Sequence, residues 1–177
     1  LSEIMAATHR EMVQAFLDSL VPTVTKALYD PLPEVRQAAA KTFDSLHSAV
    51  GSQALEEILP QLLKQLGDKN VGEYTLDGLR QVMAIKSRVV LPYLVPHLTV
   101  PPVNTRALSL LSSVADDSLN KHLAKILPAL LQSLSKSLDT ENEKQELEYC
   151  QSVILSVTDE AGRRTIVDHL LESARDD

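Results

Sequence analysis

The stretch Leu59-Pro60-Gln61-Leu62-Leu63-Lys64-Gln65-Leu66 decides the fold, because its pattern occurs four times along the chain. Each copy has an aliphatic residue, a proline, any residue, an aliphatic residue, any three residues and a leucine; the other copies are residues 21–28, 91–98 and 127–134. Successive prolines of the pattern are 38, 32 and 36 residues apart. Self-similarity at this period is typical of helical solenoids, in which each repeat contacts only its neighbours.

The composition favours an all-α protein. Hydrophobic residues make up 44% of the 177 residues, which is enough for a core. The chain has only two Phe, five Gly and no Trp, whereas a β-sandwich would contain more aromatic residues and glycines. The net charge of −7 argues against a protein that coats nucleic acid without sequence preference.

The cysteine content indicates the compartment. The single cysteine, Cys150, cannot form an internal disulfide, and the sequence Asn-x-Ser/Thr does not occur. Both observations favour a reducing compartment, and we expect a cytoplasmic protein. The apolar runs are shorter than the roughly 18 residues that a membrane-spanning helix needs, so a membrane partner is not expected. Because Leu1 falls inside a predicted helix, we expect the chain to be a segment of a longer solenoid.

The helical segments predict a right-handed α-solenoid of about four antiparallel helix pairs, with partial repeats at both ends. We place the repeats at residues 9–51, 55–87, 89–117 and 119–157, with a partial repeat at 158–177 and the tail of an earlier helix at 1–8. Because repeats contact only their neighbours, we expect one continuous segment over residues 1–177 without an internal domain boundary.

Local signals define the helix ends and the buried faces. Asp30 is placed to cap a helix that begins near Pro33, and Gly51 suits its end. Gly78 lies inside a predicted helix, for which close packing of a neighbouring segment is the ordinary reason. One buried stripe with helical spacing is formed in the second repeat by Leu55, Ile58, Leu59, Leu62, Leu63 and Leu66.

The repeats resemble those of the HEAT family. The characteristic pattern of that family, an Asp followed by Val-Arg and small residues in the second helix, is carried by Asp30, Val35, Arg36, Ala38 and Ala39. Arg106 lies fourteen residues after the proline of its repeat, as Arg36 does in the first. The second and fourth repeats have Tyr74 and Asn142 at that position, so we expect the Asp–Arg ladder of a regular HEAT stack to be interrupted.

Longer stretches are similar to the general-control translational activator family, whose members are very large HEAT scaffolds of the amino-acid starvation response. The stretches that carry this likeness are residues 35–43, 76–96, 101–106 and 150–157. The resemblance implies a ribosome-associated scaffold that helps to activate the general-control kinase, which phosphorylates the alpha subunit of initiation factor two. It also implies contact with the RWD domain of that kinase, which a C-terminal region of the family binds.

The candidate binding residues lie in a stretch without acidic residues. Residues 78–115 contain none of the 24 Asp and Glu residues of the chain. They contain four of its 17 Lys and Arg residues, namely Arg80, Lys86, Arg88 and Arg106. Such a band is suited to ribosomal RNA phosphate or to an acidic protein surface. The structural alternative is that these cations are ordinary solvated or carbonyl-facing HEAT side chains.

Other polar residues do not indicate catalysis. Acidic residues gather near the start of a predicted helix at Glu141, Glu143, Glu146 and Glu148, where they favour the helix dipole or form a docking site for a basic partner. The five histidines lack zinc-ligand spacing, and Cys150 reads as a core residue. Phosphate-loop and nucleophile-elbow motifs are absent from the sequence. We therefore expect no enzyme, no cofactor, no metal and no small-molecule substrate.

The hypothesis from sequence is a non-enzymatic HEAT scaffold that positions partners, ribosome and kinase, in translational control. One alternative is a generic HEAT adaptor that binds peptides or proteins in its concave groove, as transport receptors and phosphatase scaffolds do. A second alternative is an enzyme that uses the scattered carboxylates, which requires acidic side chains to converge in one cleft.

Overall fold

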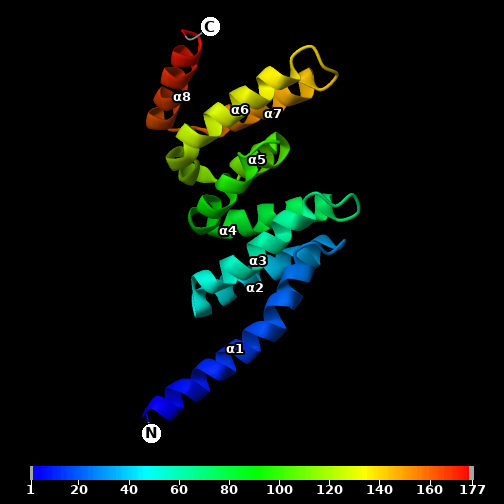
Figure 1. Ribbon diagram of the computed structural model, residues 1–177, viewed down its shortest axis with the longest axis vertical. Coiled ribbons are helices and arrows are strands. Elements are labelled where there is room, and N and C mark those ends of the chain that lie inside the picture. The colour runs from blue at the N-terminus through cyan, green and yellow to red at the C-terminus, as the bar shows by residue number, and fades with distance from the viewer. Residues whose placement is uncertain (1, 176–177) are drawn as a thin grey trace. The chain divides into compact units, whose positions relative to one another are not determined.

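The computed structural model describes the backbone of residues 2–175 and the side chains of residue 12 and residues 15–175. The described part is all-α, as predicted (Figure 1). Its elements, in chain order, are α1 (Ser2–Ala27), α2 (Pro33–Val50), α3 (Ser52–Gln65), α4 (Gly72–Leu98), α5 (Thr105–Ser112), the 3-10 helix η1 (Asp116–His122), α6 (Leu123–Ser137), α7 (Glu143–Ser156) and α8 (Glu160–Ser173).

The chain forms two compact units, residues 1–82 and 83–177. The division falls within α4, four residues before Lys86, whose backbone angles (φ −133°, ψ 42°) are not helical and mark a kink. We had expected residues 1–177 without an internal boundary, and the repeat limits within that range stay a prediction.

In the first unit, α1, α2 and α3 all contact one another. Four of the six residues of the predicted apolar stripe in the second repeat, Leu55, Ile58, Leu59 and Leu62, are buried, whereas Leu63 and Leu66 are only half-buried. Burial of each such side chain stabilises the fold by about 2 kcal/mol. The prolines Pro22 and Pro60 lie inside their helices, as the repeated pattern predicts.

Gly78 lies where the first part of α4 approaches the end of α1. A Cβ atom at this position would be 1.9 Å from the backbone oxygen of Leu28. Only a residue without a side chain permits this approach, so the prediction of close packing at Gly78 is confirmed.

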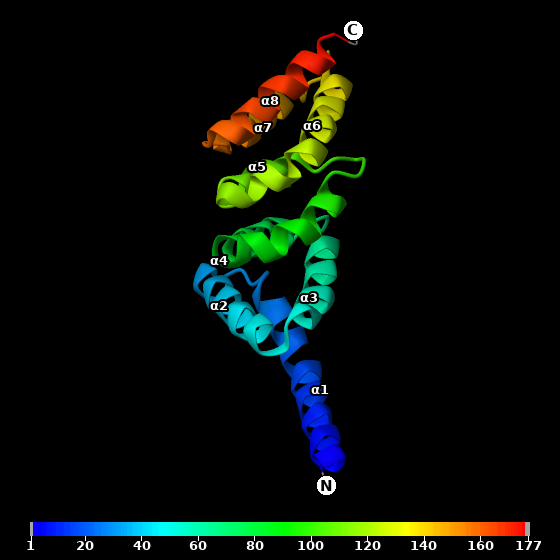
Figure 2. The same cartoon turned by 90° about the vertical axis from the view of Figure 1, so that its left-hand side faces the viewer.

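In the second unit, the helices at equivalent positions of successive repeats pack against each other. α5 contacts α7, which is the second helix of the next pair, and α6 contacts both α7 and α8. Figure 2 shows α5 and α7 on one side of this unit and α6 on the other. Ile126, Leu127 and Leu130 of α6 and Val153 of α7 are buried in the layer between them.

Some helix limits differ from the predictions. α1 is continuous through the expected boundary near residue 9, because the first 21 residues contain no Gly or Pro that would end a helix. The helix expected from residue 119 begins instead with η1, since the backbone of His122 (φ −111°, ψ −3°) interrupts the regular helical conformation. The expected gap between residues 86 and 89 is a kink rather than a turn.

The N-cap of α2 also differs from the prediction, which placed Asp30 there. Leu32 occupies the N-cap position, and Pro33 is in the first turn as expected. The Asp30 carboxylate accepts a hydrogen bond of 2.9 Å from the backbone N–H of Leu32, so it stabilises the turn before the helix rather than the helix itself. Gly51 ends α2 with a φ of 68°, a conformation that glycine adopts without strain.

Candidate functional site

Arg80, the first of the four predicted binding residues, lies in the first unit and is engaged by its own helix. Its guanidinium donates to Oδ1 of Asp77, with N···O distances of 2.8 and 3.1 Å. The other oxygen of Asp77 accepts from Nε of Arg36 at 2.7 Å. Arg80 therefore belongs to a structural ion-pair cluster between α2 and α4.

Arg36 is the centre of this cluster. It is buried, with 8% of its surface exposed, and it also donates to the backbone oxygens of Asp30 and Pro31. Its guanidinium carbon lies 5.4 Å from the centroid of the Tyr74 ring, within cation–π range. Tyr74 thus stands where a regular HEAT ladder has arginine, and the contact between the two repeats passes through Asp77.

Lys86, Arg88 and Arg106 lie in the second unit but not together. Lys86 is the kink residue of α4, and the exposed Arg88 follows it in the first turn of the second part of that helix. Arg106 is exposed in the first turn of α5, beyond the far end of α4. The twelve helical residues 87–98 between these two turns span about 18 Å. The acid-free stretch of sequence is therefore not one continuous surface.

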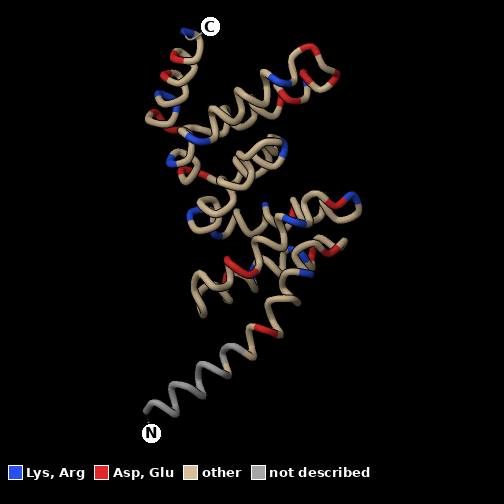
Figure 3. Tube along the Cα trace, viewed as in Figure 1, with Lys and Arg blue, Asp and Glu red and all other residues tan. Residues whose placement is uncertain are grey.

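Arg88 instead faces η1 across a surface hollow of about 340 Å³. The hollow lies in the second unit, and its lining is formed by Arg88, Pro92, Asp117, Ser118, Lys121 and His122. Figure 3 shows that the basic positions of η1 and the start of α6 lie on the same side of this unit as those that follow the kink of α4. We call this site, with the neighbouring Lys125, the basic hollow.

The cations of the basic hollow are not used to hold the fold together. Within residues 15–175, Arg88, Lys121 and Lys125 form no ion pair. All three are exposed. Arg88 and Lys125 lie in the first turns of their helical segments, where the helix dipole disfavours positive charge by about 0.3–1 kcal/mol. Their positions thus lower stability slightly instead of raising it.

The pKa of His122 reflects the positive charge around the hollow. Partial burial lowers the pKa of its imidazole below the usual value, and the charges of Lys121 and Lys125 lower it further. The imidazole is therefore mostly neutral at pH 7, and a negative charge bound nearby would raise its pKa. Asp117 is the single carboxylate among the residues that line the hollow.

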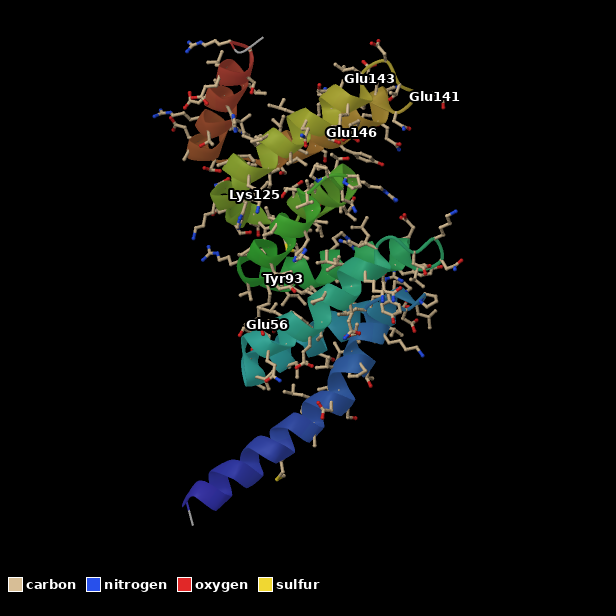
Figure 4. The ribbon with its side chains drawn as sticks, viewed as in Figure 1. Glu56, Tyr93, Lys125, Glu141, Glu143 and Glu146 are labelled. Atoms are coloured by element: carbon tan, nitrogen blue, oxygen red, sulfur yellow. The ribbon has the colours of Figure 1, made fainter. Side chains whose placement is uncertain are left out.

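The predicted acidic cluster lies at the other end of α6. Figure 4 shows Lys125 near the start of this helix and Glu141 and Glu143 beyond its end. Glu146 accepts hydrogen bonds from the hydroxyl groups of Thr105 and Ser133, so it joins α5, α6 and α7. Glu143 accepts from the backbone N–H of Asp139 at 2.9 Å. Two of the four acidic residues therefore stabilise the turn and the helix contacts.

The remaining polar groups do not form a metal centre in the described part of the chain. Among these residues, His, Cys, Asp and Glu side chains do not gather into a group of three that could hold a metal ion. Burial, together with the charge of Glu146, raises the pKa of the Cys150 thiol to about 11. The thiol is thus protonated at neutral pH and contributes to the core, as predicted. None of the described helices has the length and apolar character needed to cross a membrane.

Sequence reasoning missed Lys121, His122 and Lys125. These residues lie beyond the acid-free stretch, which ends at residue 115 because Asp116 and Asp117 follow it. One signal was available: Lys121 and Lys125 are four residues apart, a spacing that places side chains on one face of a helix. Their proximity to Arg88 comes from the packing of consecutive repeats, which the sequence pattern does not reveal.

The class of protein is defined by the helix pairs together with two family matches. Residues 20–50 match the model of the HEAT repeat. Residues 90–177, which lie in the second unit and include most of the basic hollow, match a model described as "Stalled ribosome sensor GCN1-like, HEAT repeats". No solved structure matches the chain.

Similarity to curated proteins extends over nearly the whole chain. It is 63% identical over 175 residues to the human protein "Stalled ribosome sensor GCN1", 41% identical to the Dictyostelium discoideum "eIF-2-alpha kinase activator GCN1" and 33% identical to the Saccharomyces cerevisiae protein of the same name. These alignments cover 99%, 97% and 100% of this chain and 7% of each relative. The chain belongs to the GCN1 family of HEAT-repeat proteins.

Proposed function

We propose that the chain acts as a non-enzymatic HEAT scaffold in translational control, within a ribosome-associated activator of the kinase that phosphorylates initiation factor two alpha. The observation that carries this proposal is the 63% identity to a stalled ribosome sensor over 99% of the chain. The names of the more distant relatives, kinase activators, support the same role. The cytoplasm, where ribosomes translate, is the compartment in which it would act.

The mechanism follows from the architecture. Repeats that contact only their neighbours hold separated binding sites at defined distances. We assign the ribosome as one partner and the RWD domain of the kinase as the other. Scaffolding of this kind needs accessible charged surface and no reacting groups, which agrees with the exposed cations of the basic hollow and with the protonated Cys150.

A binding experiment with the 177-residue chain tests this proposal. The purified chain is centrifuged with ribosomes, and separately mixed with the purified RWD domain, at a low and at a near-physiological salt concentration. We expect the chain to sediment with ribosomes and to retain the RWD domain, with weaker binding at higher salt. Failure to bind either partner at low salt contradicts the proposal, and capture of transport cargo instead would identify a generic HEAT adaptor.

Charge reversal at the predicted binding residues Arg80, Lys86, Arg88 and Arg106 would not report on binding alone at every position. Reversal of Arg80 would place two acidic side chains beside each other and break the contact of Arg80 with Asp77, so it would lower stability as well as binding. Arg88, which forms no ion pair within residues 15–175, is therefore reversed, while Arg80, Lys86 and Arg106, which all have interactions of their own, are kept. Arg80→Gln alone serves as the control for effects on folding.

A further inference from the structure

We propose that the basic hollow is a binding site for the phosphate backbone of RNA, contacted by Arg88, Lys121 and Lys125. This inference rests on the proposed function, because it names the part of the ribosome, its RNA, that this site would contact. It differs from the acid-free band predicted from sequence, since only Arg88 is shared between the two.

The cations of the basic hollow differ from the arginines of the first unit in their ion-pair partners. Arg36 and Arg80 of the first unit form ion pairs with Asp77, whereas Arg88, Lys121 and Lys125 have no such partner within residues 15–175. An exposed cation without a partner contributes little to stability. Three of them around one hollow form a local positive field in a chain whose net charge is −7.

The positive charge of the basic hollow includes a lysine at the start of a helix, where the helix dipole disfavours it. Lys125 is in the first turn of α6, a turn that contains no acidic residue. Lys121 comes immediately before that helix, in the last turn of η1. Helices usually have acidic residues at this end because the dipole favours them. Lys125 therefore reduces stability slightly, and a bound anion would offset this effect, whereas Lys121 stands at the end of η1, where a positive charge is not disfavoured.

The basic hollow offers charged hydrogen-bond donors that suit phosphate groups. The guanidinium of Arg88 and the ammonium groups of Lys121 and Lys125 are donors without acceptor capacity. The phosphates of a nucleic-acid strand supply several acceptor oxygens and one negative charge per nucleotide. Contacts of this kind depend on charge and not on base sequence. An acidic protein segment has similar charge, and it is treated as a competing outcome of the test.

The test measures RNA binding by the 177-residue chain. The probe is a fluorescent single-stranded RNA of roughly 12 nucleotides, a length that covers one such site. Binding is followed by anisotropy between about 50 and 200 mM salt. Three phosphate contacts predict a slope of log affinity against log salt near −2, which is a loss of about 20-fold over this range.

Matched variants assign the binding to the hollow. Arg88→Gln, Lys121→Gln and Lys125→Gln together remove three charges and are expected to abolish most of the salt-dependent binding. Lys41→Gln, Lys64→Gln and Lys69→Gln together remove the same charge from exposed positions of the first unit and are expected to leave the slope unchanged. Arg88→Lys keeps the charge and is expected to keep the slope. Circular dichroism checks that each variant is folded. If the triple variant fails to fold, Lys125→Gln alone replaces it, and this single change is expected to reduce the slope of log affinity against log salt by about 0.7.

Three results would overturn the proposal. The first is that the unchanged chain does not bind RNA at low salt. The second is that the control variant loses as much salt-dependent RNA binding as the variant of the hollow. The third is that a polyglutamate peptide binds at the hollow more tightly than RNA. The outcome is separate from that of the proposed function. A chain that binds ribosomes and the RWD domain but not RNA refutes only this inference, and a chain that binds RNA but neither of the others refutes only the proposed function.

Discussion

Both units join consecutive repeats across the same sequence interval, but with different chemistry. In the first unit, Arg36 of α2 contacts Asp77 of α4, 41 residues later. In the second unit, Thr105 of α5 contacts Glu146 of α7 across the same 41 residues. The first contact is a guanidinium–carboxylate pair, whereas the second uses neutral hydroxyl donors.

This difference determines which cations are available to a partner. The first unit engages two arginines and an aspartate in its ion-pair cluster. In the second unit, Thr105 and Ser133 satisfy Glu146, and the amide of Asn120 donates to Asp159 at 2.6 Å. The cations around the basic hollow are therefore left outside these contacts. A count of charges along the sequence does not separate arginines that form ion pairs from arginines that stay exposed, but the contacts of each side chain do.

The largest expected effect concerns the glycines that lie at contacts between helices. In Gly78→Ala the new Cβ would lie 1.9 Å from the backbone oxygen of Leu28, so the end of α1 must move. We expect the free energy of unfolding to fall by about 3 kcal/mol, measured by urea denaturation.

Gly162→Ala is the matched substitution in the second unit. Its Cβ would meet side-chain atoms, Cγ1 of Val157 at 2.5 Å and Oδ1 of Asn120 at 2.7 Å, which move more easily than backbone. We expect a loss of about 1 kcal/mol. Equal effects of the two substitutions would contradict the account of close packing at Gly78.

A smaller effect is expected from the ion-pair cluster of the first unit. Asp77→Asn leaves the buried Arg36 without its charged partner, although two backbone oxygens still accept from that arginine. We expect a loss of about 2 kcal/mol at pH 7.

The loss should depend on pH. Burial raises the pKa of the Asp77 carboxyl, but hydrogen bonds from Arg36 and Arg80 outweigh it and hold the pKa below its usual range. The stability that this carboxylate contributes is therefore present above about pH 4 and is lost as the pH falls through the folded-state pKa. Denaturation at neutral and at acidic pH checks this: the difference between Asp77→Asn and the unchanged chain should shrink in acid. A constant difference would show that the charge of Asp77 is not what matters.

The corresponding substitution in the second unit should lower the free energy of unfolding by less than Asp77→Asn does. Glu146→Gln replaces one of two accepting oxygens by an amide group, so one of the bonds from Thr105 and Ser133 is lost. We expect a loss of about 1 kcal/mol in the free energy of unfolding. Glu148→Gln, at an exposed position of the same helix, is the control and should leave stability nearly unchanged. A larger loss for Glu146→Gln than for Asp77→Asn would reverse the comparison of the two units.

The smallest expected effect is on His122. Because the charges of Lys121 and Lys125 add to the effect of burial on its pKa, replacing both lysines by Gln should raise that pKa toward its usual value without reaching it. A titration of the imidazole signals by NMR measures the change. An unaltered pKa would mean that the lysines do not create the field of the hollow.

Much of the architecture followed from the sequence because the apolar pattern directly reflects which helix faces are buried. The repeated proline pattern and the stripe around Ile58 predicted the helices, and Gly78 predicted a close contact. The kink at Lys86 and the 3-10 turn before Leu123 were not predictable, since they depend on how neighbouring helices pack.

The candidate site was predicted only in part. Arg88 was selected from the acid-free stretch, but Lys121 and Lys125 lie beyond its end and approach Arg88 only through the packing of the next repeat. Arg80 was selected for its charge, although its partner Asp77 lies one residue outside that stretch. Both features depend on which residues lie together in space, and the composition does not encode this.

Co-sedimentation with ribosomes is the most direct test of the central claim, that the unpaired cations of the second unit bind the partner. The chain with Arg88, Lys121 and Lys125 changed to Gln is compared with the chain in which Lys41, Lys64 and Lys69 are changed, at near-physiological salt. The account predicts that the first variant stays in the supernatant while the second sediments with ribosomes like the unchanged chain. Equal sedimentation of both variants would contradict it.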